Sequence, residues 1–205
     1  MNALRGRFDE ARSLGAEAAQ IYRELGLKLL VAGMTNNRGP IELLAGDPVA
    51  AERTLRDGYD GLDEMGNKAF LSTVAGHLAR ALYEQGRYDE ADHYAATCSD
   101  AAAPDDVVSQ ILWRSVRAKV LARQGEREKA EQLARAAVRL AETTETIELR
   151  GDTLFDLAEV FDLAGRRGQA IHHAREALRL YEEKGVVPSI RRVRSFLAAE
   201  PAARS

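Results

Sequence analysis

This chain of 205 residues has little cysteine and no long apolar segment, the features that are typical of secreted and membrane proteins. It has one cysteine, Cys98, so it forms no intrachain disulfide and no cysteine-based zinc site. That cysteine usage predicts a reducing, cytoplasmic location. No stretch approaches the ~18 consecutive apolar residues of a membrane-spanning helix, and residues 1–6 lack the apolar core of a signal peptide. We therefore expect a soluble protein with no membrane partner.

The chain also lacks an excess of charge of either sign. Lys and Arg number 29 and Asp and Glu 32, which gives a formal net charge of −3. A nucleic-acid-binding domain normally carries a clearly basic face, so no nucleic-acid partner is expected. Because 45% of the residues are hydrophobic and 30% are charged, the composition is that of a folded, soluble chain.

Catalytic motifs are missing as well. The sequence holds no glycine-rich phosphate loop ending in Gly-Lys-Ser/Thr and no His-Glu-x-x-His helix. No serine sits in a Gly-x-Ser-x-Gly setting. We therefore predict a protein without catalytic residues, metal or cofactor, whose chemistry, if the natural protein has any, lies in other domains.

What the sequence does contain is a regular repeat. Five glycines recur at spacings of 40, 40, 39 and 40 residues, and an alanine follows each of them five positions later. Self-similarity at this period is typical of stacked repeat arrays. The glycines are Gly6, Gly46, Gly86, Gly125 and Gly165, and the alanines are Ala11, Ala51, Ala91, Ala130 and Ala170.

The residues around each glycine follow helical spacing, as Leu71, Val74, Leu78 and Leu82 do before Gly86. Each unit is therefore predicted to be a helical hairpin with the glycine at its turn. We expect a first helix over roughly 8–25, pairs over roughly 27–45/48–65, 67–85/88–102, 106–124/127–143 and 146–164/167–184, and a last helix over roughly 188–199.

The whole chain, 1–205, is predicted to form one solenoid domain. Residues 1–25 form a half-repeat, residues 26–65, 66–104, 105–144 and 145–184 form full repeats, and residues 185–200 form a C-terminal capping helix. The half-repeat leaves the apolar side of its helix without a usual neighbour. We expect either that the natural protein continues N-terminally or that this side mediates self-association. It carries Leu14, Ala18, Ile21 and Leu25.

One of these turns carries a family resemblance. The segment Gly86-Arg87-Tyr88-Asp89-Glu90-Ala91, echoed at residues 6–11, resembles the turn and second-helix start of a tetratricopeptide repeat (TPR). Leu78-Ala79, Leu82-Tyr83, Ala95 and Cys98 fall on that repeat's packing positions. The likeness spans nearly the whole chain, but the period is ~40 instead of ~34 residues, so each helix is longer by nearly a turn.

The long variant is similar to the C-terminal arrays of bacterial signalling proteins, which place such repeats behind ATPase, nucleotide-cyclase or LuxR-type DNA-binding modules. The resemblance implies an all-α, right-handed superhelix of antiparallel helical hairpins. It also implies that the first helix of each pair lines a concave face. The leading function is then a non-enzymatic interaction or regulatory module that binds a peptide or domain there.

Within that face, the residues six before each glycine form an inner row of Pro40, Arg80, Lys119 and Glu159. We expect a groove that runs from neutral amides through a basic centre to an acidic end, which suits a charged partner segment. An ordinary solvated face is the alternative. The candidate partner-binding residues are Asn36, Asn37, His77, Arg80, Tyr83, Ser115, Lys119, Arg123, Asp156 and Glu159.

Two other functions remain open from the sequence. The concave face could close on a small ligand and act as a sensor, or the half-repeat side could make the chain an oligomerisation scaffold. His172 occupies a repeat position that is polar in every unit and therefore faces solvent, so no metal site is expected at His172 and His173.

Two residues break the repeat pattern. Pro40 is predicted to break its helix near Asn36 and Asn37. Arg117 stands in a core position, where it needs an acidic partner, for which Glu84 and Asp156 are the candidates.

Overall fold

The computed structural model describes residues 1–199, which form an all-α fold without a strand in that range. The elements are η1 (Ala3–Arg5), α1 (Phe8–Glu24), α2 (Lys28–Gly33), α3 (Thr35–Ala45), α4 (Pro48–Glu64), α5 (Lys68–Glu84), α6 (Tyr88–Ala101), α7 (Val107–Arg123), α8 (Arg127–Glu142), α9 (Ile147–Leu163), α10 (Arg167–Lys184) and α11 (Val187–Ala198). The predicted helix bounds are confirmed to within a few residues, and the predicted helix over 27–45 is divided into α2 and α3. Of the predicted capping segment 185–200, residue 200 lies outside the described part of the chain. No described helix is long and apolar enough to cross a membrane.

The turns use the repeat glycines as predicted. Gly86 ends the first helix of its hairpin with a φ of 78°, a left-handed conformation that costs glycine little. The backbone N–H of Arg87 then donates to the carbonyl of Leu82 at 3.0 Å, which satisfies an otherwise unpaired carbonyl at the helix end. The other repeat glycines, and Gly26, Gly66 and Gly185 at the opposite ends of the hairpins, share this conformation.

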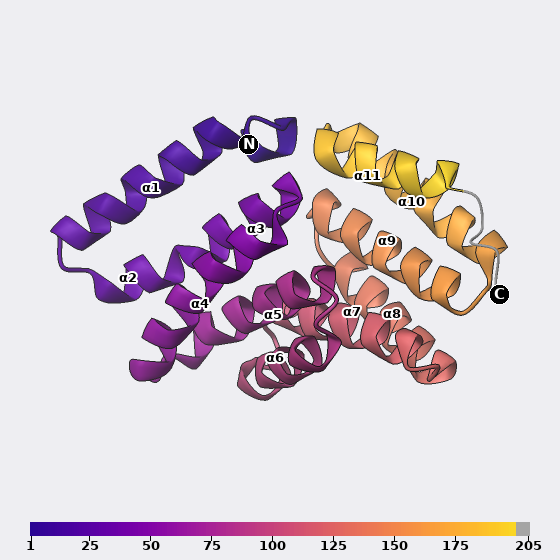
Figure 1. Cartoon of the computed structure of the whole chain (residues 1–205), viewed down its shortest axis with the longest axis horizontal. Coiled ribbons are helices and arrows are strands. Elements are labelled where there is room, and N and C mark those ends of the chain that lie inside the picture. The colour runs from indigo at the N-terminus through magenta and orange to yellow at the C-terminus, as the bar shows by residue number, and fades with distance from the viewer. Residues whose placement is uncertain (200–205) are drawn as a thin grey trace.

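The hairpins stack into a right-handed superhelix in which α5, α7 and α9 lie side by side on the inner surface (Figure 1). Small residues set the close approach between helices. The repeat alanines Ala51, Ala91, Ala130 and Ala170 are completely buried. Leucines, such as the buried Leu78 and Leu82, fill the space between the helices.

The array curves far enough for its two ends to meet. In Figure 1, η1 and the end of α3 lie beside the start of α11, and both contact that helix. Leu4 and Leu44 pack against a cluster that includes Phe155, Val186 and Val193. The concave face is therefore closed at one edge by contact between the first and last elements.

The helix that contains Pro40 is interrupted at Met34, between α2 and α3, two residues before the predicted position near Asn36 and Asn37. Pro40 itself lies inside α3. The interruption follows Gly33, and glycine has a weak helical preference. The loss of one backbone donor at Pro40 therefore weakens the helix but does not end it at Pro40.

Candidate functional site

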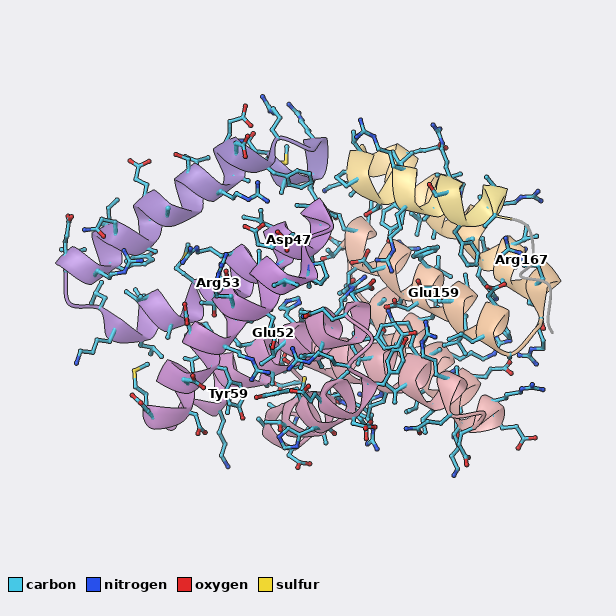
Figure 2. All side chains as sticks on the ribbon, viewed as in Figure 1. Asp47, Glu52, Arg53, Tyr59, Glu159 and Arg167 are labelled. Carbon is cyan, nitrogen blue, oxygen red and sulfur yellow. The ribbon has the colours of Figure 1, made fainter. Side chains whose placement is uncertain are left out.

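A cluster of charged side chains fills the centre of the concave face. We call it the inner charge network: Arg80 and Glu84 of α5, Lys119 of α7, Asp152, Asp156 and Glu159 of α9, and Arg192 of α11. Glu159 is labelled in Figure 2. Lys119 is at its middle and is completely buried. Its Nζ lies 2.8 Å from Asp156 Oδ1 and 3.2 Å from Glu159 Oε2.

Arg192 ties this network across the array. Its Nη2 donates to Glu84 Oε1 at 3.0 Å and to Glu159 Oε1 at 3.1 Å. Its guanidinium also lies 5.1 Å from the ring centroid of Phe155. One side chain thus joins α5, α9 and α11, although Glu84 and Arg192 are 108 positions apart in the sequence.

The charges in this network stabilise one another. Burial would lower the pKa of Lys119, but Asp156, Glu159 and Glu84 outweigh it and raise that pKa. Burial would likewise raise the pKa of Asp156, but Lys119 and Arg80 outweigh it and lower that pKa. Lys119 and Asp156 are therefore both charged at neutral pH, and they form an ion pair with each other instead of contacting solvent.

This arrangement corrects the predicted basic centre of the groove. Lys119 cannot present its charge to a partner, because no part of it is exposed. Ser115 and Asp156 are also buried, at 5% and 4% exposure. The physical reason is curvature: the inner helices converge so closely that residues expected to face solvent pack against one another.

Tyr83 and Arg123 form the outer border of the network. Tyr83 is 6% exposed, and its hydroxyl accepts a hydrogen bond from Arg123 Nε at 2.9 Å. Its ring lies 4.6 Å from Lys119 Nζ, within the range of a cation–π contact. Arg123 also stacks over Tyr88, 4.7 Å from the ring centroid. The exposed Arg123 is therefore held in place by two aromatic rings.

Between the network and the two ends of the array lies a cavity of about 730 Å³. Both halves of the chain line the cavity. The lining residues include members of η1, α3, α5, α9, α10 and α11. Its apolar wall includes Leu4, Leu44, Phe155, Val187 and Val193. Its polar lining includes His77, Arg80, Asp152, Arg191 and Arg192.

Two polar groups of this cavity have unused hydrogen-bonding capacity. The Arg80 side chain is only 16% exposed; its nearest carboxylate is Asp152, 3.7 Å from Nη1, and it donates no hydrogen bond to any residue of 1–199. Asp152 instead accepts from the hydroxyl of Tyr181 at 2.5 Å. The buried Nδ1 of His77 has no partner among these residues either. Burial and the charge of Arg80 lower the pKa of His77 to about 3, so the imidazole is neutral.

Of the predicted site residues, the structure thus brings Arg80, Lys119, Asp156 and Glu159 into one network. Asn36 and Asn37 do not reach it or the cavity. Asn37 is exposed, and Asn36 has a buried Oδ1 without a partner among residues 1–199. These amides therefore lie on α3 away from the charged centre.

Sequence reasoning misses the contributions of Asp152 and Arg192 and the cavity itself. The helical pattern predicts Arg192 on the solvent side of the last helix, and its side chain is 40% exposed while it makes both ion pairs. The repeat pattern predicts which residues of each helix lie on the inner side of the superhelix. The distance between α5 and α11 depends instead on how tightly the superhelix curves. No sequence pattern near Arg192 signals that distance.

Arg117 also differs from its prediction. It pairs with Asp92 of α6, with Arg117 Nε to Asp92 Oδ1 at 2.9 Å, and not with Glu84 or Asp156. Its side chain is 37% exposed. The long stem lies along the packing position while the guanidinium reaches solvent, so no buried charge results.

One group of side chains has the composition of a metal site. His172, His173 and Glu176 of α10 bring ligand atoms within 4.8 Å of one another. Arg135, Arg139, Arg150 and Arg179 line the same depression. Four guanidinium groups oppose the approach of a divalent cation, so this cluster does not favour metal binding.

Comparison with known proteins agrees with the repeat. Family models described as tetratricopeptide repeat match residues 107–183 and 71–98, together about half of the chain. No curated protein matches the sequence.

Among solved structures, BtubC (BKLC) from P. vanneervenii is similar with a TM-score of 0.61 and 16% identity, over 98% of this chain and 78% of that one. The nearly identical TPR-like repeats of a putative kinesin light chain from Podosopora anserina are similar with a TM-score of 0.54 and 16% identity, over 97% and 92% of the two chains. A point variant of the latter gives a TM-score of 0.55 and 16% identity, over 89% and 91%. At this identity the likeness shows the fold alone.

Proposed function

Because the chain belongs to the tetratricopeptide-repeat family, whose repeats are generally protein-interaction modules, we propose that it binds a segment of a partner protein in the cavity on its concave face. The observation that carries this proposal is the cavity of about 730 Å³ between the inner charge network and the array ends. Its volume lies within the ~300–1,000 Å³ typical of small-molecule and cofactor pockets.

The lining of the cavity supports a peptide segment as the occupant. Leu44 and Phe155 offer apolar surface to a side chain. Arg80 and the Nδ1 of His77 have hydrogen-bonding capacity that the described chain does not use. A few polar groups set in an apolar wall fix the orientation of a bound group. The extended groove predicted along the whole concave face is replaced in this proposal by a local site.

Peptide display tests the proposal directly. Peptides selected on the wild-type chain are measured again on His77→Trp, which fills part of the cavity from its wall. The control is Arg53→Trp on α4, an exposed residue outside the cavity (Figure 2). We expect His77→Trp to weaken the selected peptides by at least about tenfold, a loss of ~1.4 kcal/mol, and Arg53→Trp to leave them unchanged. Equal binding by both variants, with both folded by circular dichroism, would contradict the cavity as the site.

A small-ligand sensor is the second candidate, and the closure of the array supports it. Contact between η1 and α11 limits the length of chain that can pass along the concave face. A metabolite enclosed there at 100 times its dissociation constant would add ~2.7 kcal/mol of stability. Thermal-shift screening would then show a rise of about 5–10 °C for the wild type. A function in a cytoplasmic bacterial signalling protein stays a prediction from the sequence resemblance.

A further inference from the structure

Exposed apolar side chains form a stripe along α1, and more of them follow at the start of the next helix. Leu14 and Ile21 of α1 are 57% and 49% exposed, and Leu25, directly after α1, is 65% exposed. Leu27, directly before α2, and Leu30, in its first turn, are 42% and 37% exposed. Large apolar residues gathered on one surface, instead of scattered singly, mark an interaction site.

The equivalent helix of the next repeat, α4, shows what packs on this side of the helix. Forty residues later, on α4, Gly58 lies against Thr35 and Gly61 lies against Ala32. Thr35 and Ala32 belong to α3 and α2, the first half of the same repeat. That side of α4 is therefore the surface on which the first helix of a repeat packs. The corresponding positions of α1 are Ala18 and Ile21.

In the first repeat of the described chain, only the three-residue η1 precedes α1. The stripe on α1 is thus a surface built to receive a helix and is covered by none of residues 1–199. We call it the helix seat, and it consists of Leu14, Ala18 and Ile21 of α1, Leu25 and Leu27 of the turn that follows, and Leu30 of α2.

An acidic row borders the helix seat. Glu10, Glu17 and Glu24 recur every seven residues, so they lie on nearly the same side of α1. Glu17 is three residues after Leu14 and four before Ile21, which makes it a direct neighbour of both. All three glutamates are exposed, and none forms an ion pair with another residue of 1–199.

We infer that the helix seat binds an amphipathic helix of a partner protein whose apolar side is edged by Lys or Arg. The apolar stripe supplies the contact area, and the row of carboxylates selects a basic edge. A matching helix is about 25 Å long, the length of the 17 residues of α1. A second copy of this chain fits less well, because two α1 helices paired across their seats would bring Glu17 of one copy close to Glu24 of the other.

The test uses two designed 17-residue helical peptides with the same leucine stripe. One carries lysines along the edge of the stripe and the other carries glutamates, and fluorescence anisotropy measures their binding to the full chain. We expect the basic peptide to bind at least about tenfold more tightly than the acidic one, with the difference falling as salt rises. In the Glu17→Lys/Glu24→Lys variant, this preference should reverse.

Two further variants locate the contact. Ile21→Glu should abolish binding of the basic peptide without unfolding the chain, since this side chain is already half exposed. Val49→Glu is the matched control, because Val49 is 62% exposed on α4 and lies outside the seat. His77→Trp should leave the peptide affinity unchanged, so this result is independent of the proposed cavity function.

Three outcomes would overturn the inference. The first is equal binding of the two peptides, which would show that the acidic row selects nothing. The second is an absence of binding by either peptide to the wild-type chain. The third is a wild-type dimer in light scattering that Ile21→Glu converts to a monomer, which would assign the seat to a second copy.

Discussion

Replacing Lys119 by Met tests whether the inner charge network stabilises the fold through mutual neutralisation. Methionine keeps much of the volume of the lysine stem, so the main change is the loss of the ammonium. Asp156, 4% exposed and 2.8 Å from that ammonium, then becomes a buried carboxylate without its closest cation. Removing one member of a buried pair costs about 3–5 kcal/mol.

We expect a value near the low end of that range, about 3 kcal/mol, because Arg80 and Arg192 still act on Asp156. For a chain of this size, that loss lowers Tm by about 6–12 °C. Glu159 and Glu84 have side chains that are 22% and 29% exposed, so water compensates them in part.

The pH dependence gives a second, independent readout. In the wild type the pKa of Asp156 is below its ordinary value of 3.8, so its contribution to stability is present above pH 3.8 and is lost as the pH falls further. Without the Lys119 ammonium, burial raises that pKa, and the native state takes up a proton before the unfolded state does. The deficit of Lys119→Met should therefore shrink as the pH falls from 7 towards 4.

Urea denaturation at pH 7 and at pH 4.5 measures both effects, with Lys119→Met/Asp156→Leu as the companion variant. The double variant replaces the pair by apolar groups, so it should recover most of the lost stability. A loss below about 1 kcal/mol for Lys119→Met, or a deficit that grows towards low pH, would refute the reasoning.

Three further predictions concern packing and reactivity. Gly58→Ala should destabilise the chain by about 1–3 kcal/mol in urea denaturation, since an added Cβ would lie 2.0 Å from Oγ1 of the buried Thr35. Gly168→Ala on α10 should instead stabilise it by about 0.5–1 kcal/mol, because apart from the adjoining backbone no atom lies within 4 Å of the added methyl; a loss of Tm would contradict this. Cys98 should react with a thiol reagent only in denaturant, because it is fully buried and burial raises its pKa to about 12; rapid labelling of the native chain would be the opposite result.

The helices and their turns could be predicted from the sequence because they depend on local signals. Gly46, Gly86 and Gly165 mark turns by a conformational need that is met within a few residues. The alanine five residues after each marks a helix contact in the same unit. Repetition strengthens each signal, since one unit's pattern supports the assignment of the next.

The candidate site could be predicted only in part, because it depends on how far the superhelix turns over several repeats. The repeat register correctly assigns Lys119 to the inner side of α7, but its burial follows from the approach of α5 and α9 to α11. Arg192 joins the network from a helix three units away from Glu84. A small rotation at each repeat accumulates into that distance, and no single residue encodes it.

The meeting of η1 and α3 with α11 changes how the whole array unfolds. In an open solenoid each repeat contacts only its neighbours, so the terminal repeats fray and exchange their amide hydrogens first. Here the first and last elements contact each other, and the pair of Glu84 with Arg192 spans the inside of the curve. Opening one end therefore also breaks contacts of the other end. The linear array is thereby converted into a closed unit, in which the amides of α3 and α11 exchange together and unfolding is more cooperative than in an open array of the same repeats.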